Sequence, residues 1–375
     1  MIPLVDIVRQ DRKIQPQIIS AIKKITQKGD FILGEEVEKF EKEFARYCGV
    51  KHCVGVASGT DAILLALRAL GIGSGDEVIV PANTFISSVL PIIYVGATPI
   101  ITDIDPKSYN IDVSKIEEKI SKKTKAIIPV HLFGQIAEMD KILKIAKKHK
   151  LFVVEDAAQA HGSTFKNKKA SLPAGKAGSF SDIACFSFYP GKNLGAYGDA
   201  GAIVTNNKSI AERIKILRNI GQVKKYIHSE KGYNSRLDTI QAAVLRIKLR
   251  QLDKWNQERR HLAALYSKLL SGLPVSIPIQ TDGNVSNFHL YVIRAPKRDR
   301  LLKYLHKNKI FAGIHYPVPI HLHKALRNLP YKKGDFPVTE KYASQIISLP
   351  IFPGMSEKEV GIITEAIKNF YGYKK

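Results

Sequence analysis

The segment DKILKIAKKHKLFVVED, residues 140–156, contains the alternation that decides the fold class. Asp140–His149 is typical of a helix, and Leu151–Glu155 is typical of a short, largely apolar strand. The same order of helix and then strand recurs upstream, at Ala62–Leu70 with Val78–Val80 and at Lys115–Ile120 with Ala126–Val130. Short apolar strands joined by helices predict an α/β fold, in which helices cover both faces of a mostly parallel sheet.

The pattern changes after about residue 236. Strands at Ala184–Phe188 and Ala202–Thr205 still belong to the first series, but Leu237–Leu270 then predicts a long helical stretch that breaks near Trp255–Asn256. Further elements follow as an alternating strand at Phe288–Ile293, a basic helix at Arg298–Asn308 and a strand at Ile310–His315.

A final helix begins at Ser356, which matches a capping box with Glu359. We therefore predict two domains. The first is a large α/β domain over residues 1–250, which includes the N-terminal arm, and the second is a smaller α+β domain over residues 251–375.

The charge of the chain is unusual, because 58 Lys and Arg against 34 Asp and Glu give a net charge of +24 and a pI of about 9.7. Nucleic-acid-binding proteins have such a balance, usually with a basic stripe or patch. Here Lys outnumbers Arg by 43 to 15, and the basic clusters are scattered along the chain. This distribution indicates a solvated surface, so we predict no nucleic-acid partner and keep a basic nucleic-acid-binding regulator as the competing class.

One stretch is a candidate membrane span. Val78–Thr102 carries no charge over 25 residues and is long enough to cross a bilayer. Prolines and a glycine interrupt it, which favours two buried strands that flank a short helix. The start of the chain lacks the features of a signal peptide. Three cysteines at no metal-like spacing predict neither a disulfide framework nor a metal site. We expect a cytoplasmic protein without a membrane partner.

The first candidate for chemistry is a turn at Ser58, Gly59 and Thr60, which follows an apolar strand and opens a helix. A glycine there lets backbone N–H groups approach a ligand, and the helix N-terminus favours an anion such as phosphate. An ordinary helix N-cap explains the same residues.

Three further residues complete a pattern. Asp156 ends a strand, Lys192 lies in a turn among aromatic residues, glycine and proline, and Phe85 follows another strand. A lysine in such surroundings loses its proton readily and can form a Schiff base. A phosphate-binding turn, a carboxylate, a lysine and a flat ring are what pyridoxal 5′-phosphate (PLP) requires of a protein. The bland alternatives are an N-cap for Asp156, a surface charge for Lys192 and core packing for Phe85.

Nearly the whole chain resembles the DegT/DnrJ/StrS family of sugar aminotransferases, which have the fold type I architecture of PLP enzymes. The matching stretches are GDFILGEEVEKFEKEFA (29–45), VASGTDAILLAL (56–67), GDEVIVPANTFI (75–86), VEDAAQAHGS (154–163), FSFYPGKNLGAYGDAGAIVTN (186–206), GYNSRLDTIQAAVL (232–245) and GIHYPVPIHLH (313–323).

The resemblance implies roles for these residues. Lys192 would form the Schiff base with PLP and then act as general base and acid. Asp156 would pair with the pyridine nitrogen, Gln159 would hydrogen-bond the ring hydroxyl oxygen, and Phe85 would stack on the ring. A surface position on a helix is the alternative for Gln159.

The phosphate would be held by Gly59, Thr60 and Ser187. Asn234 would reach the phosphate of a neighbouring subunit, which implies a homodimer with shared active sites. His315 and Tyr316 would approach the nucleotide sugar. A turn-forming role is the alternative for Asn234, and a strand-end histidine is the alternative for His315.

By the same resemblance, L-glutamate would give its amino group to a ketone on a nucleotide-linked sugar, in the synthesis of amino sugars for a surface polysaccharide such as an O-antigen. The stretches FYPGKNLGAYGDAG and IHYPVPIHLH most resemble those of members that aminate the third carbon of a 3-oxo hexose or a 3-oxo-glucuronate. A dehydratase or epimerase of the same family is the alternative, although members with histidine at the position of Lys192 are the dehydratases. Ala170–Gly178 departs from the family pattern as a short insertion.

Overall fold

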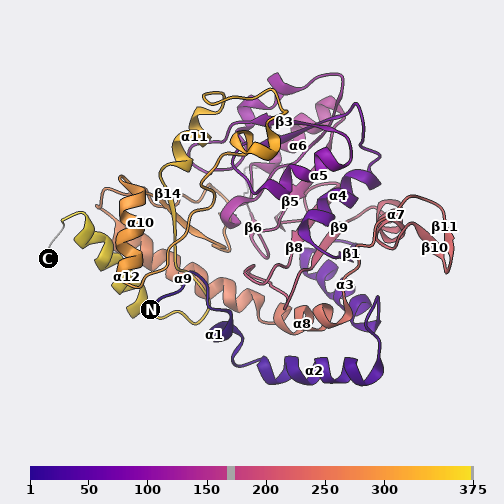
Figure 1. Cartoon of the computed structure of the whole chain (residues 1–375), viewed down its shortest axis with the longest axis horizontal. Coiled ribbons are helices and arrows are strands. Elements are labelled where there is room, and N and C mark those ends of the chain that lie inside the picture. The colour runs from indigo at the N-terminus through magenta and orange to yellow at the C-terminus, as the bar shows by residue number, and fades with distance from the viewer. Residues whose placement is uncertain (167–173, 373–375) are drawn as a thin grey trace.

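The computed structural model describes residues 1–166 and 174–372. Its centre is a seven-stranded sheet in the order β1-β9-β8-β5-β4-β2-β3 (Figure 1). The strands are β1 (His52–Val56), β2 (Glu77–Pro81), β3 (Thr98–Thr102), β4 (Thr124–Ile127), β5 (Phe152–Asp156), β8 (Ile183–Ser187) and β9 (Gly201–Thr205). Within this sheet only β9 runs antiparallel to its neighbours, so the predicted mostly parallel sheet is confirmed.

Helices pack on both faces of this sheet because successive strand residues point to opposite sides. In β5, Val153 packs in one apolar cluster and Val154 in the other. The helices of the first cluster are α3 (Glu35–Cys48), α6 (Met139–His149) and α8 (Thr239–Leu249), and those of the second are α4 (Gly59–Ala69), α5 (Leu90–Tyr94) and α7 (Lys208–Arg218). The two-sided cover that the sequence predicted is therefore confirmed.

The C-terminal part of the chain has an apolar cluster of its own. That cluster joins residues 262–367 with Ile2 of the N-terminal arm. The elements of this part of the chain are α9 (Leu252–Leu270), β13 (Tyr291–Arg294), α10 (Arg298–Lys307), α11 (Pro337–Ala343), β14 (Ile346–Leu349) and α12 (Glu357–Phe370), and Tyr342 of α11 packs in a separate small cluster. β13 and β14 pair antiparallel, and the predicted capping box of Ser356 and Glu359 is present.

The N-terminal arm connects the two parts. It contains α1 (Ile7–Asp11) and leads into α2 (Gln15–Lys28), which contacts α8. Ile2 forms a parallel bridge with Ile310, and the Arg9 guanidinium donates to both carboxylate oxygens of Glu359 at 2.9 Å. Figure 1 shows the N-terminus beside α12 at one end of the molecule.

The remaining elements are short. They are the 3₁₀ turns η1 (Ile86–Ser88), η2 (Val113–Lys115), η3 (Glu117–Lys119), η4 (Leu132–Gly134), η5 (Ile320–Leu322) and η6 (Lys324–Leu326), and the strands β6 (Thr164–Phe165), β7 (Gly175–Lys176), β10 (Gln222–Lys224), β11 (Ile227–His228) and β12 (Asn284–Val285). β10 and β11 form a hairpin that projects from the molecule in Figure 1.

Three predicted elements were wrong in detail. The segment predicted as a helix at Lys115–Ile120 forms two 3₁₀ turns, η2 and η3. The long helical stretch breaks at Arg250 and Gln251, so Trp255 and Asn256 lie inside α9. The strand predicted at Ile310–His315 is reduced to single bridges at Ile310 and Gly313.

Two further expectations concern special segments. Val78–Thr102 resolves into β2, α5 and β3, as predicted. No helix in the described ranges combines the length and apolar character needed to cross a bilayer. The first half of the expected insertion, 170–173, lies outside the described residues, and Gly175–Lys176 forms β7, which pairs with β6.

Candidate active site

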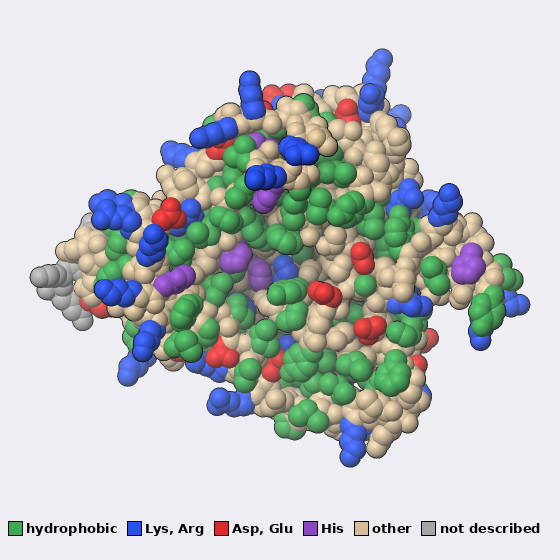
Figure 2. Space-filling view, in the orientation of Figure 1, with side chains coloured by type: hydrophobic (Ala, Val, Ile, Leu, Met, Phe, Trp, Pro, Cys, Tyr) green, Lys and Arg blue, Asp and Glu red, His purple; other side chains and the backbone are tan. Residues whose placement is uncertain are grey.

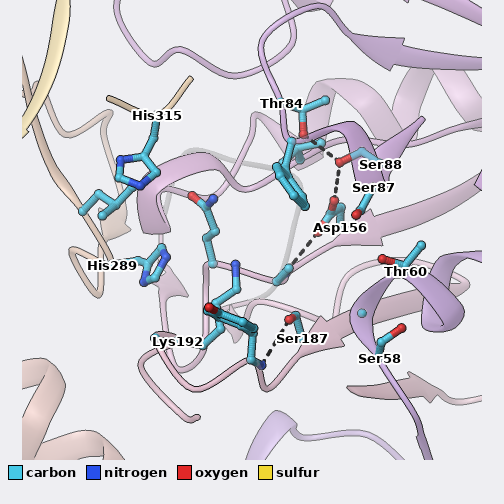
Figure 3. A pocket seen from close by; sticks show the side chains of 18 of the residues that line it. Ser58, Thr60, Thr84, Ser87, Ser88, Asp156, Ser187, Lys192, His289 and His315 are labelled. Atoms are coloured by element: carbon cyan, nitrogen blue, oxygen red, sulfur yellow. Dashed lines mark hydrogen bonds between the residues drawn. The ribbon is translucent and has the colours of Figure 1, made fainter. Parts of the chain in front are cut away.

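One cavity of about 420 Å³ lies where the carboxyl ends of β5 and β8 meet the N-terminus of α4 (Figure 3). Ligands of open α/β sheets bind at such ends. The predicted residues that line this cavity are Ser58, Gly59, Thr60, Phe85, Asp156, Gln159, Ser187, Lys192, His315 and Tyr316. The structure thus brings together residues from five separate stretches of the sequence.

Lys192 ends a tight turn that starts at Tyr189, within the connection 188–200 between β8 and β9. Its backbone N–H donates to the Tyr189 carbonyl at 2.8 Å, and a side chain at Gly195 would collide with the backbone of Pro190. Loss of hydration in the cavity lowers the pKa of the Lys192 ammonium to about 8, although the negative charge of Asp156 opposes this shift. The free amine is therefore present at a substantial fraction near neutral pH, as a Schiff-base lysine requires.

Asp156 is the last residue of β5 and is buried. Ser88 Oγ donates to Asp156 Oδ2 at 2.6 Å, and the Ala158 backbone N–H donates to Oδ1 at 3.1 Å. The neighbouring Glu155 lies on the opposite face of the strand, where the His131 ring and the loop at Gly178 hold its carboxylate. The alternation of β5 therefore directs one acid into the core and the other into the cavity.

Gln159 lies at the wall of the cavity rather than on a helix surface. Its Oε1 accepts from the Phe133 backbone N–H at 2.6 Å, and its Nε2 donates to the Tyr316 hydroxyl at 3.1 Å. Phe85 is half-exposed, and its ring centroid lies 5.4 Å from that of Tyr316 at an angle of 36°. Its exposure to the cavity, rather than to the core, leaves a ring face available for stacking.

The turn at Ser58, Gly59 and Thr60 has the features of both an ordinary helix N-cap and an anion site. Ser58 is an N-cap, because its side chain accepts from the Asp61 backbone N–H at 3.1 Å. The first backbone N–H groups of α4, at Gly59 and Thr60, have no intrahelical partner by the geometry of a helix. A Cβ on Gly59 would lie 2.6 Å from the Cβ of Ser187, so only glycine lets the helix start approach the end of β8 this closely.

Two histidines form another wall. His315 Nδ1 lies 2.9 Å from Ser348 Oγ, and burial, together with the positive charge of Lys192, lowers the pKa of His315 to about 4. The sequence interpretation missed His289, whose Nδ1 lies 3.0 Å from Asn193 Oδ1. Burial holds the pKa of His289 well below its usual range, so both rings are neutral near pH 7.

Other cavity residues were also missed. Leu4 and Val5 of the N-terminal arm line it, as do Thr84, Ser88 and Asp199. Thr84 and Ser88 flank the predicted Phe85, and that proximity was the only available signal for them. The arm had no signal, because its position depends on contacts with the C-terminal part of the chain.

Asn234 is the one predicted site residue that does not line the cavity. It is exposed and forms an isolated bridge with Asn219. The adjacent Ser235 hydroxyl donates to Asp61 Oδ2 at 2.8 Å, which ties this segment to the first turn of α4.

The residues of the cavity fit PLP. A lysine with a lowered pKa, a buried carboxylate held by two donors and a helix N-terminus pressed against Ser187 correspond to the aldehyde, the ring nitrogen and the phosphate of that cofactor. Gln159 and Phe85 supply a hydrogen-bonding group and a flat ring beside them.

Comparisons with known proteins agree with this site. The profile of the DegT/DnrJ/EryC1/StrS aminotransferase family matches residues 12–368. The chain is 48% identical, over all of both chains, to the dTDP-3-amino-3,6-dideoxy-alpha-D-galactopyranose transaminase of Aneurinibacillus thermoaerophilus. It is 37% identical to the UDP-2-acetamido-2-deoxy-3-oxo-D-glucuronate aminotransferase of Pseudomonas aeruginosa, over 98% of this chain and 100% of that protein.

Among solved structures, DesV of S. venezuelae in complex with a ketimine intermediate superimposes with a TM-score of 0.96 at 42% identity, covering 100% of this chain and 99% of that one. The fold predicted from the resemblance is therefore confirmed. Because the family profile and these relatives span nearly the entire sequence, the chain belongs to the DegT/DnrJ/EryC1/StrS aminotransferase family.

Proposed function

We propose that this aminotransferase uses PLP to transfer the amino group of L-glutamate to a ketone at the third carbon of a nucleotide-linked hexose. The observation that carries the proposal is the convergence of Lys192, Asp156 and the Gly59 turn on one cavity in a chain of this family. The names of the relatives in A. thermoaerophilus and P. aeruginosa both refer to sugars that bear nitrogen or oxygen at the third carbon.

Bound PLP supplies an electron sink that stabilises negative charge on the carbon that loses its proton. Lys192 Nζ holds the cofactor covalently at rest. Once its amine is free, Nζ accepts the proton from the α-carbon of glutamate and later delivers a proton to the third carbon of the sugar. The lowered pKa of Lys192 suits both proton removal and proton delivery, because the free amine and the ammonium are then both present near neutral pH.

The remaining residues orient the reactants. Asp156 holds the proton on the ring nitrogen, and Gln159 hydrogen-bonds the ring hydroxyl oxygen. Gly59, Thr60 and Ser187 bind the phosphate, and Phe85 covers one ring face. His315 and Tyr316 lie across the cavity from the phosphate-binding turn and contact the nucleotide sugar. His315 does not compete with Lys192 for a proton, since burial and the positive charge of Lys192 lower the pKa of His315 to about 4. Tyr316 keeps its own proton, because burial raises its pKa.

A homodimer with shared active sites is part of the proposal. Its support is the exposed position of Asn234 outside its own cavity, on a segment that is tied to α4. A cytoplasmic location is also proposed, and the three free, buried cysteines support it. We assign the product to surface-polysaccharide synthesis such as that of an O-antigen.

Dehydration or epimerisation of the sugar is the second candidate. The presence of lysine at position 192, where family dehydratases have histidine, favours amine transfer, and the named relatives are aminotransferases. The nucleic-acid-binding alternative is not favoured, because the family profile spans the chain.

The test is product analysis by mass spectrometry, with dTDP- and UDP-linked 3-keto sugars and L-glutamate. We expect one 2-oxoglutarate for each amino sugar formed, and no conversion without glutamate. A modified sugar that forms without consumption of glutamate would assign the chain to the dehydratase or epimerase class. An enzyme that takes up PLP but converts no keto sugar would contradict the proposed function.

A further inference from the structure

A chain of two buried hydroxyl groups ends on the acid of the active site. Ser88 Oγ donates to Asp156 Oδ2 at 2.6 Å, and Thr84 Oγ1 lies 2.7 Å from Ser88 Oγ (Figure 3). Ser88 is 1% exposed and Thr84 is 3% exposed. Water therefore cannot replace either hydroxyl freely at its partner.

The direction of the protons follows from their number. A serine hydroxyl has one proton, and Ser88 donates it to Asp156 Oδ2. Thr84 must then donate to Ser88. The order of donation is Thr84 to Ser88 to Asp156, and each bond polarises the next.

The two donors on Asp156 reach different oxygens. Ala158 N–H donates to Oδ1 at 3.1 Å and Ser88 to Oδ2. Donors on both oxygens fix the plane of the carboxylate, and further lone pairs remain on the side that faces the cavity. Ser88 belongs to η1, which is preceded directly by Phe85, so one segment carries both the ring that lines the cavity and the donor to its acid.

We propose that Thr84 and Ser88 are positioning residues, which hold the Asp156 carboxylate in the plane and at the charge distribution needed to pair with the cofactor ring nitrogen. The inference rests on the proposed function, because it assigns the partner of Asp156 to that ring. Neither residue touches the reacting atoms; each acts through Asp156.

The test compares Thr84→Val, which removes the hydroxyl at nearly constant volume, with Thr84→Ser, which keeps it. Ser88→Ala removes the direct donor. The first readout is the dissociation constant of PLP, measured by fluorescence titration of each apoenzyme. The second is the pH midpoint of the visible absorbance change of the loaded protein, which reports the charge held on the cofactor and needs no turnover.

We expect Ser88→Ala to weaken PLP binding about fivefold or more, because a buried carboxylate loses a short hydrogen bond. The pH midpoint should also rise by about half a unit. The positive charge on the ring nitrogen lowers the proton affinity of the Schiff base, and this effect weakens when Asp156 holds that charge less firmly. Thr84→Val should shift both values in the same direction by less, and Thr84→Ser should restore them.

Ser87→Ala is the matched control for the midpoint, because Ser87 lines the same cavity beside Ser88 and has no hydrogen bond to Asp156 among the described contacts. An unchanged midpoint and PLP affinity in both Ser88→Ala and Thr84→Val would overturn the inference. A midpoint that shifts equally in Ser87→Ala would also overturn it. A wild-type protein that does not take up PLP would instead contradict the proposed function.

Discussion

Lys192 differs from the other lysines of this chain in its surroundings rather than in its chemistry. Most of the 43 lysines lie in polar stretches, whereas Lys192 sits in a glycine-rich turn at the edge of a cavity with neutral histidines and an aromatic ring. Burial makes the ammonium form costly, which is why its pKa is lowered to about 8.

The first prediction concerns pH. The rate of covalent attachment of PLP to the apoenzyme should rise about tenfold per pH unit below pH 8 and level off above it, because only the neutral amine reacts. Stopped-flow absorbance at several pH values measures this rate. A rate that kept rising to about pH 10 would show an ordinary solvated lysine. In Asp156→Asn the inflection should move to lower pH, since the charge of Asp156 raises the pKa of Lys192.

The second prediction concerns Asp156 itself. Asp156→Asn should keep its fold and bind PLP within about tenfold of the wild type. Its amide oxygen can still accept from the Ala158 N–H, and the Ser88 hydroxyl can rotate to accept from the amide NH2 group. Turnover should fall by about 100-fold or more, since an amide cannot hold the ring nitrogen in its protonated form. Steady-state kinetics and PLP titration measure the two effects. Full turnover in this variant would remove Asp156 from its assigned role.

At the scale of elements, β5, β8 and the start of α4 determine where the site lies. β5 ends in Asp156 and β8 in Ser187, and their parallel pairing brings both ends to one edge of the sheet. The connection 188–200 joins β8 to the antiparallel strand β9, and backbone hydrogen bonds from Phe188 to Ala200 and from Ala196 to Phe188 hold the loop that carries Lys192 against the strand ends.

The third prediction concerns the close packing of Gly59 against β8. Gly59→Ala should destabilise the protein by about 1–3 kcal/mol and weaken PLP binding, because its Cβ would meet Ser187 Cβ at 2.6 Å and push the phosphate-binding turn away from β8. Thermal unfolding and PLP titration measure both effects.

Gly361→Ala is its matched control. Gly361 lies inside α12, where an added Cβ has no atom within 4 Å, so alanine should stabilise the helix by about 0.5–1 kcal/mol. If both substitutions had the same effect on PLP binding, close packing at Gly59 would not explain its requirement.

The sequence predicted the sheet well because its strands are short apolar runs between helices, as in β5 and β2. It predicted the helix at Lys115–Ile120 wrongly, because the segment is short and its two 3₁₀ turns have the same local composition. The break between α8 and α9 carries no glycine or proline, so only packing shows that it falls at Arg250 and Gln251.

The sequence pointed to those cavity residues that belong to a recognisable motif. It did not point to residues that only tertiary contacts place at the cavity. Lys192, Asp156 and Gln159 belong to recognisable stretches. His289 and Leu4 reach the cavity from distant parts of the chain and have no local pattern that marks them. Ser88 was missed because a serine in an apolar segment does not reveal its partner until the strand end beside it is placed.

On the scale of the whole molecule, the boundary at residue 250 stays a prediction. Its support is the break between α8 and α9 and the separate apolar cluster that follows it. The N-terminal arm spans both parts, since Ile2 joins the C-terminal cluster while Leu4 and Val5 line the cavity.

The net charge of +24 is distributed widely. Figure 2 shows Lys and Arg side chains projecting around the rim of this face, with histidine and apolar side chains nearer its middle. A positive field aids the capture of PLP and a nucleotide diphosphate sugar, which are both anionic. A few cations near the cavity are enough for that effect, so most of the excess charge has no explanation in the site.

The fourth prediction tests the shared active site. Lys192→Ala and Asn234→Ala should each lose most activity as homodimers. When they are mixed under conditions that exchange subunits, about a quarter of the wild-type activity should return, because half of the dimers are mixed and each has one intact site. No recovery in verified mixed dimers would show that Asn234 does not serve the neighbouring subunit.

The central claim is that Lys192 is the residue that binds PLP covalently. Addition of PLP to the apoenzyme should produce a visible absorbance band that borohydride bleaches, and peptide mapping by mass spectrometry should then find the reduced adduct on Lys192. Lys192→Ala should lack the band, and Lys208→Ala, at an exposed lysine that begins α7, should keep it. A colourless wild type, or an adduct on another lysine with the band retained in Lys192→Ala, would contradict the account.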